Sequence, residues 1–319
     1  MRHIEFRAMN CEMSAVLDTE CSKFDALLQQ VPEWFEAWEQ TFSRFRPESE
    51  LSRLNASAGQ VFKASEDLWA VVDLAVRTAR THQGLVTPTV LNALVDAGYG
   101  QSFEQLMDVA PSKRTINQPQ TLDALAQIKC DEQARTVYLP PEVHLDLGGF
   151  VKGWCADMVV QRLGQYAPAL MDAGGDIAVS GAMADGGDWA IGIADPFDAE
   201  HDLALVMVKG CGVATSGRDY RKWTQDGSPR YHIIDPRTGK SALTDVLSAT
   251  VIAPSTQLAE LASKMLLILG SQAGMEWLNV QEAQEGYAAC MVLEDGALRM
   301  NALFEQYRWQ APASAVNKI

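Results

Sequence analysis

The stretch DLGGFVKGWCAD, residues 146–157, places two adjacent glycines directly before a segment with helical hydrophobic spacing. Glycines at the start of a helix let backbone N–H groups approach an anion closely, and Lys152 adds a positive charge beside them. The stretch has neither the GxGxxG of dinucleotide-binding folds nor the GKS or GKT of a P-loop. It is therefore interpreted either as an anion-binding turn or as a tight strand-to-helix turn without a ligand.

Segments typical of strands and helices surround this turn. Hydrophobic spacing predicts helices over Val151–Leu163 and residues 257–269. Strands are expected at residues 136–139, 169–171, 189–193, 203–208 and 249–252. Because helices separate only some of these strands, the order predicts an α+β fold with a mixed or antiparallel sheet.

The N-terminal part is expected to hold one strand over residues 6–18 and a helix that begins near Pro32. Aromatic side chains spaced three to four residues apart form one stripe on this helix, namely Trp34, Trp38, Phe42 and Phe45. Such a stripe is usually buried in the core, and we expect the same here with the end of the stripe left open. Ser49 follows in a position to cap a further helix.

The composition is that of a globular chain, and it excludes several classes of protein. Of 319 residues, 47% are hydrophobic, and 41 acidic against 26 basic residues give a net charge of -15. This charge opposes binding to nucleic acid or to an anionic membrane surface, so we expect neither partner. The six cysteines form no CxxC pair and no cluster with zinc-ligand spacing.

No segment of the sequence has the properties of a membrane span. The longest strongly apolar run covers only residues 265–269, and the first residues lack the apolar core of a signal peptide. We therefore expect a cytoplasmic protein without a membrane segment.

Two glycine-rich stretches follow the first one. MDAGGDIAVSG, residues 171–181, either allows a close backbone approach to a ligand or forms a turn capped by aspartate. ATSGRDYRKW, residues 214–223, begins with two hydroxyl residues and a glycine, and Arg218 adds a guanidinium group that suits a phosphate.

Two further stretches carry charged groups. RYHIIDPRTGK, residues 230–240, places His232 beside a turn, where a lone histidine is more often structural but neighbouring polar stretches favour a site. TVIAPSTQLAELASKMLLILG, residues 250–270, has the pattern of a helix capped by Ser255 or Thr256. Glu260 and Lys264 lie four residues apart on it, a spacing that also fits a plain salt bridge.

Taken together, these stretches resemble the ApbE family of FAD:protein FMN transferases. In the family's order, the chain shows FRAMNC, FSRFRPESELSRLN, VTPTVLNALV, DLGGFVKG, MDAGGDI, ATSGRDY, HIIDPRTG, VIAPSTQLAE and LILG. The resemblance implies an α+β, ApbE-like fold in which mixed sheets and flanking helices form two lobes around a groove for the flavin nucleotide. It covers nearly the whole chain, so we expect one ApbE-like domain over residues 1–319, with a polar surface segment at about residues 110–132.

The resemblance also implies an activity. The family cleaves FAD between its phosphates, joins FMN through a phosphoester to a Thr or Ser of a protein with a motif of roughly D-x-x-T-G-A-T, and releases AMP. Magnesium neutralises the diphosphate. FAD and an unidentified acceptor protein are thus the expected partners. Two alternatives use the same residues: a carrier or sensor that binds FAD without transfer, and a pyrophosphatase that hydrolyses FAD.

The resemblance assigns roles to residues that match the family's motifs. The matches to cofactor-binding positions are Met9, Phe45, Thr87, Pro88, Thr89, Gly149, Lys152, Asp157, Thr215, Ser216 and Gly217. Lys152 and His232 are the candidate catalytic residues. His232 matches a histidine near the reacting phosphates, where it would steer or deprotonate the acceptor hydroxyl.

The chain departs from the family at the metal. Family members offer an Asp and, four residues later, a Thr or Ser, where this chain has Glu260 and Lys264. An ammonium group cannot bind Mg²⁺. Either Lys264 places its charge where the ion would lie and contacts the diphosphate, or Lys264 faces solvent and the ion binds the carbonyl of Val151 together with Glu260 and Ser263.

Overall fold

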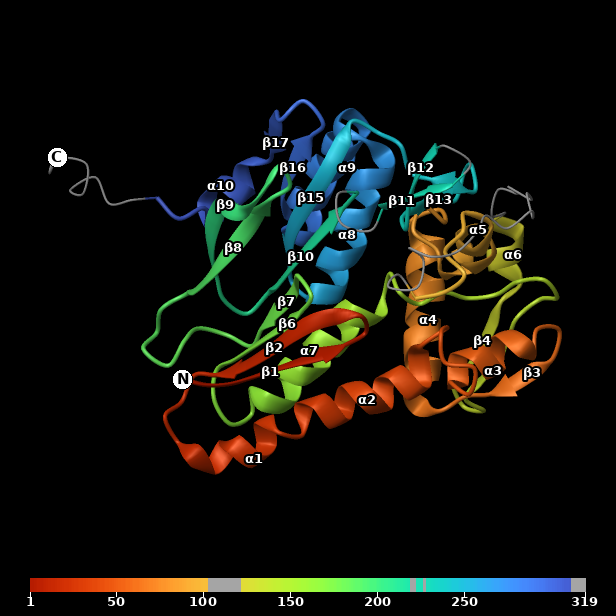
Figure 1. Ribbon diagram of the computed structural model, residues 1–319, viewed down its shortest axis with the longest axis horizontal. Coiled ribbons are helices and arrows are strands. Elements are labelled where there is room, and N and C mark those ends of the chain that lie inside the picture. The colour runs from red at the N-terminus through yellow and green to blue at the C-terminus, as the bar shows by residue number, and fades with distance from the viewer. Residues whose placement is uncertain (103–121, 219–221, 226–227, 311–319) are drawn as a thin grey trace, which may run out of the picture.

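The computed structural model describes residues 1–102, 122–218, 222–225 and 228–310. Its centre is an eight-stranded sheet with the strand order β1-β2-β6-β7-β10-β15-β16-β17, in which all neighbours are antiparallel (Figure 1). Its strands are β1 (Arg2–Ala8), β2 (Cys11–Leu17), β6 (Ala169–Ala173), β7 (Asp176–Val179), β10 (Gly212–Gly217), β15 (Val246–Ala253), β16 (Ala288–Leu293) and β17 (Leu298–Met300).

Both faces of the large sheet are covered. Helices α7 (Val151–Leu163) and α8 (Thr256–Leu269) pack on one face, and the hairpin of β8 (Trp189–Asp195) and β9 (Asp198–Val208) packs on the other. Helix α10 (Ala302–Tyr307) lies on the hairpin side. Since neither face meets water, β15 and β16 are almost continuous runs of buried residues.

A second group of elements, to the right of the large sheet in Figure 1, is mainly helical. It consists of α3 (Glu50–Ala56), α4 (Glu66–Thr81), η2 (Pro88–Val90), α5 (Leu91–Asp96), α6 (Leu122–Gln127) and a small sheet of β3 (Val61–Lys63), β5 (Thr136–Tyr138) and β4 (Lys129–Asp131). The observed architecture is therefore the expected α+β class, with two lobes.

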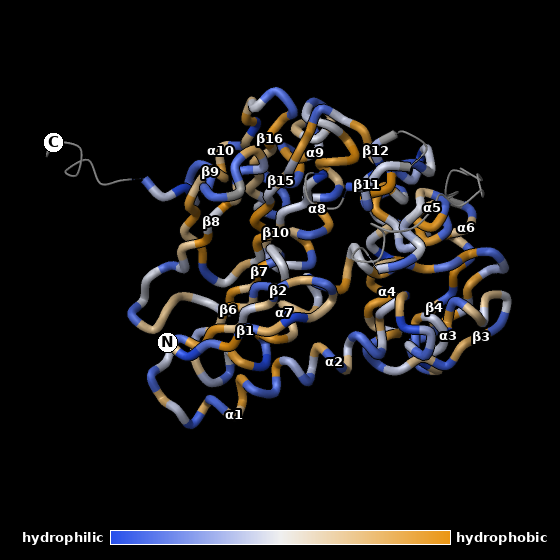
Figure 2. Tube along the Cα trace, in the orientation of Figure 1, coloured by the Kyte–Doolittle hydropathy of each residue, from blue (hydrophilic) through white to orange (hydrophobic). Residues whose placement is uncertain are grey.

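Helix α2 (Val31–Phe42) runs from below the large sheet towards the helical lobe (Figure 1). Hydrophobic residues recur along it every three to four positions, with hydrophilic residues between them (Figure 2). The rings of Trp38 and Phe42 lie on its buried face, and each ring centre is 5.6 Å from that of Trp154 in α7. This aromatic contact fixes α2 against the helix that follows the glycine-rich turn.

Two short hairpins lie near α5 at the upper right of Figure 1. They are formed by β11 (Lys222–Gln225) with β12 (Ser228–Tyr231) and by β13 (Ile234–Asp235) with β14 (Lys240–Ser241). Ile234 shares a small buried cluster with Leu94 and Tyr99. The remaining described elements are η1 (Ser22–Phe24), α1 (Asp25–Leu28) and α9 (Ser271–Glu285).

Several local predictions are confirmed. The helix after the glycine pair spans the expected residues, and Ser49 and Ser255 cap α3 and α8 by accepting hydrogen bonds from the backbone N–H groups of Ser52 and Leu258. Glu260 and Lys264 form the expected ion pair, with 3.0 Å between Oε1 and Nζ.

Two predictions for the N-terminal part are wrong. Residues 6–18 form a hairpin and not one strand, because Met9 and Asn10 adopt left-handed φ angles of 50° and 58° that reverse the chain. Phe45 does not extend the aromatic stripe of α2, because the helix ends at Phe42 and Ser43 is already extended.

The second half of the expected polar surface segment, at about residues 110–132, contains regular structure. Residues 110–121 of this segment lie outside the described part of the chain. Beyond them, α6 and β4 form regular structure, and Leu125 and Ile128 are buried in the core of the helical lobe. Most of the other side chains from residue 123 to residue 132 are exposed, so this half of the segment lies at the surface and two apolar side chains anchor it to the core.

Within the described ranges, every helix is too short or too polar to span a bilayer. The cytoplasmic location stays a prediction.

Candidate functional site

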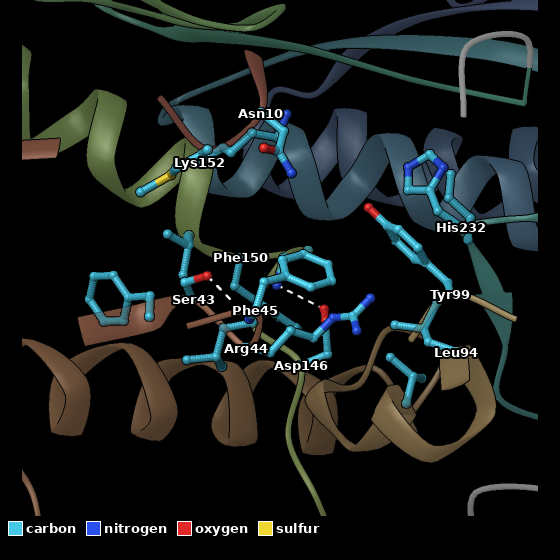
Figure 3. A pocket seen from close by; sticks show the side chains of 18 of the residues that line it. Asn10, Ser43, Arg44, Phe45, Leu94, Tyr99, Asp146, Phe150, Lys152 and His232 are labelled. Carbon is cyan, nitrogen blue, oxygen red and sulfur yellow. Dashed lines mark hydrogen bonds and ion pairs between the residues drawn. The ribbon is translucent and has the colours of Figure 1, made fainter. Parts of the chain in front are cut away.

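A cavity of about 470 Å³ opens between the two lobes (Figure 3). Its walls come from the β1–β2 turn, the segment after α2, the loop before α5, the glycine-rich turn, the β12–β13 connection and helix α8. Sequence-predicted site residues that line it are Met9, Phe45, Thr87, Gly149, Val151, Lys152, His232 and Lys264. The fold thus brings together residues from six separate segments of the chain.

Lys152 lies in the first turn of α7 and reaches into the cavity near Asn10 (Figure 3). Its ammonium group donates a hydrogen bond to the buried carboxylate of Asp176. Burial by itself would lower the pKa of Lys152, but the carboxylates of Asp176 and Glu260 outweigh this effect and raise the pKa to about 12. The ammonium group therefore stays charged at any physiological pH.

Glu260 lies behind the cavity wall and is fully buried. Its Oε1 accepts a hydrogen bond from Lys264 Nζ at 3.0 Å, and its Oε2 accepts one from the Gly153 N–H at 3.0 Å. Burial raises the pKa of Glu260, and the nearby ammonium groups of Lys264 and Lys152 oppose this rise. Both oxygens of the carboxylate thus already have a partner within the protein.

Ser263, the other candidate metal ligand on α8, is also fully buried. Its Oγ lies 2.7 Å from the Ser216 Oγ and 3.0 Å from the Glu260 carbonyl oxygen. Because of the contact with Ser263, the Ser216 side chain faces α8 and not the cavity. The hydroxyl is therefore directed into the protein interior.

Arg44 is a site residue that the sequence analysis missed. Its side chain is only 6% exposed, and its Nε lies 2.6 Å from Asp146 Oδ2. The guanidinium carbon is 4.0 Å from the ring centre of Phe45 and 4.6 Å from that of Tyr99 (Figure 3). Nη2 is buried and has no hydrogen-bond partner among the residues that the structure describes. Its only sequence signal is its position in the family-like FSRFR run.

His232 is half-buried and lies at the opposite end of the cavity from Lys152 in the view of Figure 3. It comes from the connection between β12 and β13, on the side of the cavity where Tyr99 also lies. The lysines approach from helices α7 and α8. The imidazole of His232 and the ammonium group of Lys152 therefore line different parts of the same cavity.

Other predicted residues lie outside the cavity lining. Pro88 and Thr89 are buried next to it, where the Pro88 carbonyl accepts a hydrogen bond from the Asp146 N–H and the Thr89 hydroxyl pairs with that of Thr87. Thr215 pairs with Thr250 across the sheet, 2.8 Å between hydroxyl oxygens. Gly217 ends strand β10.

Arg218, whose guanidinium group would suit a phosphate, does not line the cavity. Its side chain is 3% exposed, donates to the carbonyl oxygens of Val246 and Thr244, and pairs with Glu294. The guanidinium group therefore connects the end of β10 to the start of β15 and to Glu294 after β16.

Asp157 joins α7 to the start of α8. Its two carboxylate oxygens accept hydrogen bonds from the N–H groups of Thr256 and Gln257, at 2.9 and 3.1 Å. Burial raises the pKa of Asp157, and these backbone bonds oppose the rise. The carboxylate thus satisfies two N–H groups that a helix start leaves without an internal partner.

The variant Asp157→Ala is expected to lose about 1.5–3 kcal/mol of unfolding free energy, because it leaves these N–H groups buried without an acceptor. FAD affinity should stay close to that of the unchanged protein. Denaturant unfolding and FAD titration measure the two quantities, with exposed Glu48→Ala as the control. Weaker FAD binding without loss of stability would instead assign Asp157 to the ligand.

The residues present do not fit a magnesium site. Magnesium requires several oxygen ligands in octahedral geometry, but the Glu260 oxygens are occupied, Ser263 faces inward and Lys264 Nζ lies at the carboxylate. Among the described residues, no three His, Cys, Asp or Glu side chains lie together in a position to hold a metal ion.

Comparison with known proteins agrees with this architecture. The chain is 30% identical over 267 residues to the FAD:protein FMN transferase of Vibrio cholerae serotype O1, covering 82% of this chain and 76% of that protein. It is 30% identical over 319 aligned positions to the protein of the same name from Treponema pallidum, covering 92% and 84%.

Solved structures show the same fold. The ApbE protein of Thermotoga maritima matches with a TM-score of 0.83 at 24% identity, covering 97% of this chain and 99% of that one. The flavin transferase ApbE of Vibrio cholerae matches with a TM-score of 0.76, also at 24% identity, covering 96% and 98%. Residues 9–291 match the ApbE family as a whole. With its sheet, its two lobes and the motifs around its cavity, the chain belongs to the ApbE family.

Proposed function

We propose that this protein is an FAD:protein FMN transferase. It cleaves FAD between its two phosphates, joins FMN through a phosphoester to a Thr or Ser of an acceptor protein and releases AMP. The observation that carries the proposal is the cavity between the lobes, where six residues that match cofactor or catalytic positions of the family's motifs line one space: Met9, Phe45, Thr87, Gly149, Lys152 and His232. The curated relatives carry the name of this activity.

The chemistry of the cavity walls suits the parts of FAD. The rings of Phe45 and Tyr99 and the guanidinium plane of Arg44 offer flat surfaces on which a planar ring system can stack. Arg44 Nη2, which has no hydrogen-bond partner in the described part of the chain, would gain an acceptor from a ligand oxygen. The ammonium groups of Lys152 and Lys264 provide positive charge for the diphosphate.

In the proposed reaction, the acceptor hydroxyl oxygen attacks the phosphorus on the flavin side of FAD. A new P–O bond forms to the acceptor, and the bond from that phosphorus to the bridging oxygen breaks. The bridging oxygen leaves with AMP, and His232 takes the hydroxyl proton. The charged Lys152 stabilises the negative charge that develops on the phosphate oxygens. No step passes through a metal ion, because the residues do not fit one.

The acceptor is proposed to be a protein with a D-x-x-T-G-A-T segment, and incubation with such a protein and FAD tests the function directly. We expect a flavin that stays bound to the acceptor after denaturation, and AMP in equal amount. The matched control is the acceptor with valine in place of the modified threonine, which should receive no flavin. Binding of FAD without AMP would indicate a carrier, and AMP without acceptor labelling a pyrophosphatase. Either result would contradict the proposal.

A further inference from the structure

We infer that the ammonium group of Lys264, held on the buried carboxylate of Glu260, takes the place of a divalent cation at the FAD diphosphate, so that this protein binds FAD without metal. The inference rests on the proposed function, which makes FAD the ligand of the cavity. It concerns how this chain neutralises the diphosphate.

The first step is the position of Lys264. Its side chain is 14% exposed and lines the cavity, whereas Glu260, to which its Nζ is bound, is fully buried. The ligand therefore meets the ammonium group and not the carboxylate. An ammonium group has three N–H donors, and Glu260 Oε1 and the Glu260 carbonyl, at 3.0 and 3.4 Å, accept from it on the protein side. At least one donor remains for a phosphate oxygen.

The second step is the space that the glycine-rich turn leaves for this side chain. A Cβ atom at Gly149 would lie 3.3 Å from Lys264 Cε and 3.5 Å from Cδ. The lysine thus passes in contact with the turn whose position before α7 suits an anion. The backbone of Gly149 and the ammonium group of Lys264 therefore lie at the same wall of the cavity.

The third step is the competition between lysine and metal. A divalent ion at Glu260 would have to displace the Lys264 ammonium group or accept a like charge close by, in a region with little water to screen the repulsion. It would also have to break the hydrogen bond from the Gly153 N–H to Oε2 or share that oxygen. A pre-formed pair of Glu260 and Lys264 avoids both costs. Lys152, paired with Asp176, adds a second fixed charge.

The test is titration of FAD into the purified protein, followed by flavin fluorescence, once with EDTA and once with Mg²⁺. We expect equal dissociation constants in the two conditions, and no heat when Mg²⁺ is titrated calorimetrically into the FAD complex. Binding that requires Mg²⁺ would overturn the inference and leave the proposed function intact. Failure to bind FAD in either condition would instead contradict the proposed function.

Two variants make the test specific. Lys264→Thr should weaken FAD binding in EDTA about 10- to 100-fold, the loss expected for a charged hydrogen bond, and Mg²⁺ should restore it because the Glu260 carboxylate and a new hydroxyl become available. Lys264→Met should show the same loss without rescue, since it offers no oxygen. Thermal unfolding monitored by circular dichroism checks that both variants fold. Metal-free binding of unchanged strength in folded Lys264→Thr would overturn the inference.

Discussion

Replacing His232 with alanine is expected to lower the rate of FMN transfer about 100- to 10,000-fold, the usual effect of losing a general base. FAD binding should change little. The reason is that the ammonium groups of Lys152 and Lys264 are the groups proposed to hold the diphosphate, whereas the imidazole enters the same cavity from the β12–β13 connection and is proposed to act on the acceptor hydroxyl. The acceptor hydroxyl would then lack a group that takes its proton, although the ligand is still held.

Single-turnover labelling of the acceptor gives the transfer rate, and fluorescence titration gives the FAD dissociation constant. His144→Ala is the matched control, because His144 pairs with Asn92 outside the cavity lining and should have no effect on transfer. Equal transfer rates for His232→Ala and the unchanged protein would remove His232 from the mechanism. Equal losses of binding and transfer would make it a ligand-binding residue only.

Replacing Gly212 with alanine is expected to destabilise the protein by about 3 kcal/mol or more, at or above the upper end of the usual cost of overpacking. Gly212 begins strand β10, and a Cβ atom there would lie 2.0 Å from the backbone nitrogen of Thr256 and 2.2 Å from its Cα. These are backbone atoms at the start of α8, and the Thr256 N–H is already bonded to Asp157. The helix can therefore relieve the clash only by moving away from the sheet.

The same movement would displace Glu260 and Lys264, which α8 carries to the cavity. We therefore expect weaker FAD binding together with a lower unfolding midpoint in urea. Gly181→Ala is the control, because a Cβ atom at Gly181 meets nothing within 4 Å and its φ is not in the left-handed range. Equal midpoints for Gly212→Ala and Gly181→Ala would show that the contact between β10 and α8 tolerates a methyl group.

Much of the local structure followed from the sequence. The hydrophobic spacing of helices α7 and α8 and the Ser255 cap of α8 depend only on residues within a few positions of one another, and both helices were predicted correctly. The ion pair of Glu260 and Lys264 is of the same kind, because four residues on a helix always share a face. The ordered motifs also identified the family.

Which residues line the cavity depended on the tertiary structure. Arg44 and Phe45 face the cavity because α2 ends at Phe42 and the chain turns towards Tyr99, more than fifty residues further on. Thr215 and Ser216 lie in a motif that matches cofactor-binding positions of the family. In the structure, however, the Thr215 hydroxyl is hydrogen-bonded to Thr250 on the neighbouring strand, and the Ser216 hydroxyl to Ser263 on α8. Spacing along a strand does not tell which partner will cover each face.

By itself, the sequence determined the family, the α+β class, the main helices and the charge pair at the centre of the further inference. Only the tertiary structure decided that Asp157 caps α8, that Glu260 is buried behind Lys264, and that the lysine is the group that the cavity presents. Local elements form from interactions between near neighbours, whereas burial depends on contacts between segments about a hundred residues apart. Those contacts set which charges meet a ligand and which stabilise the fold.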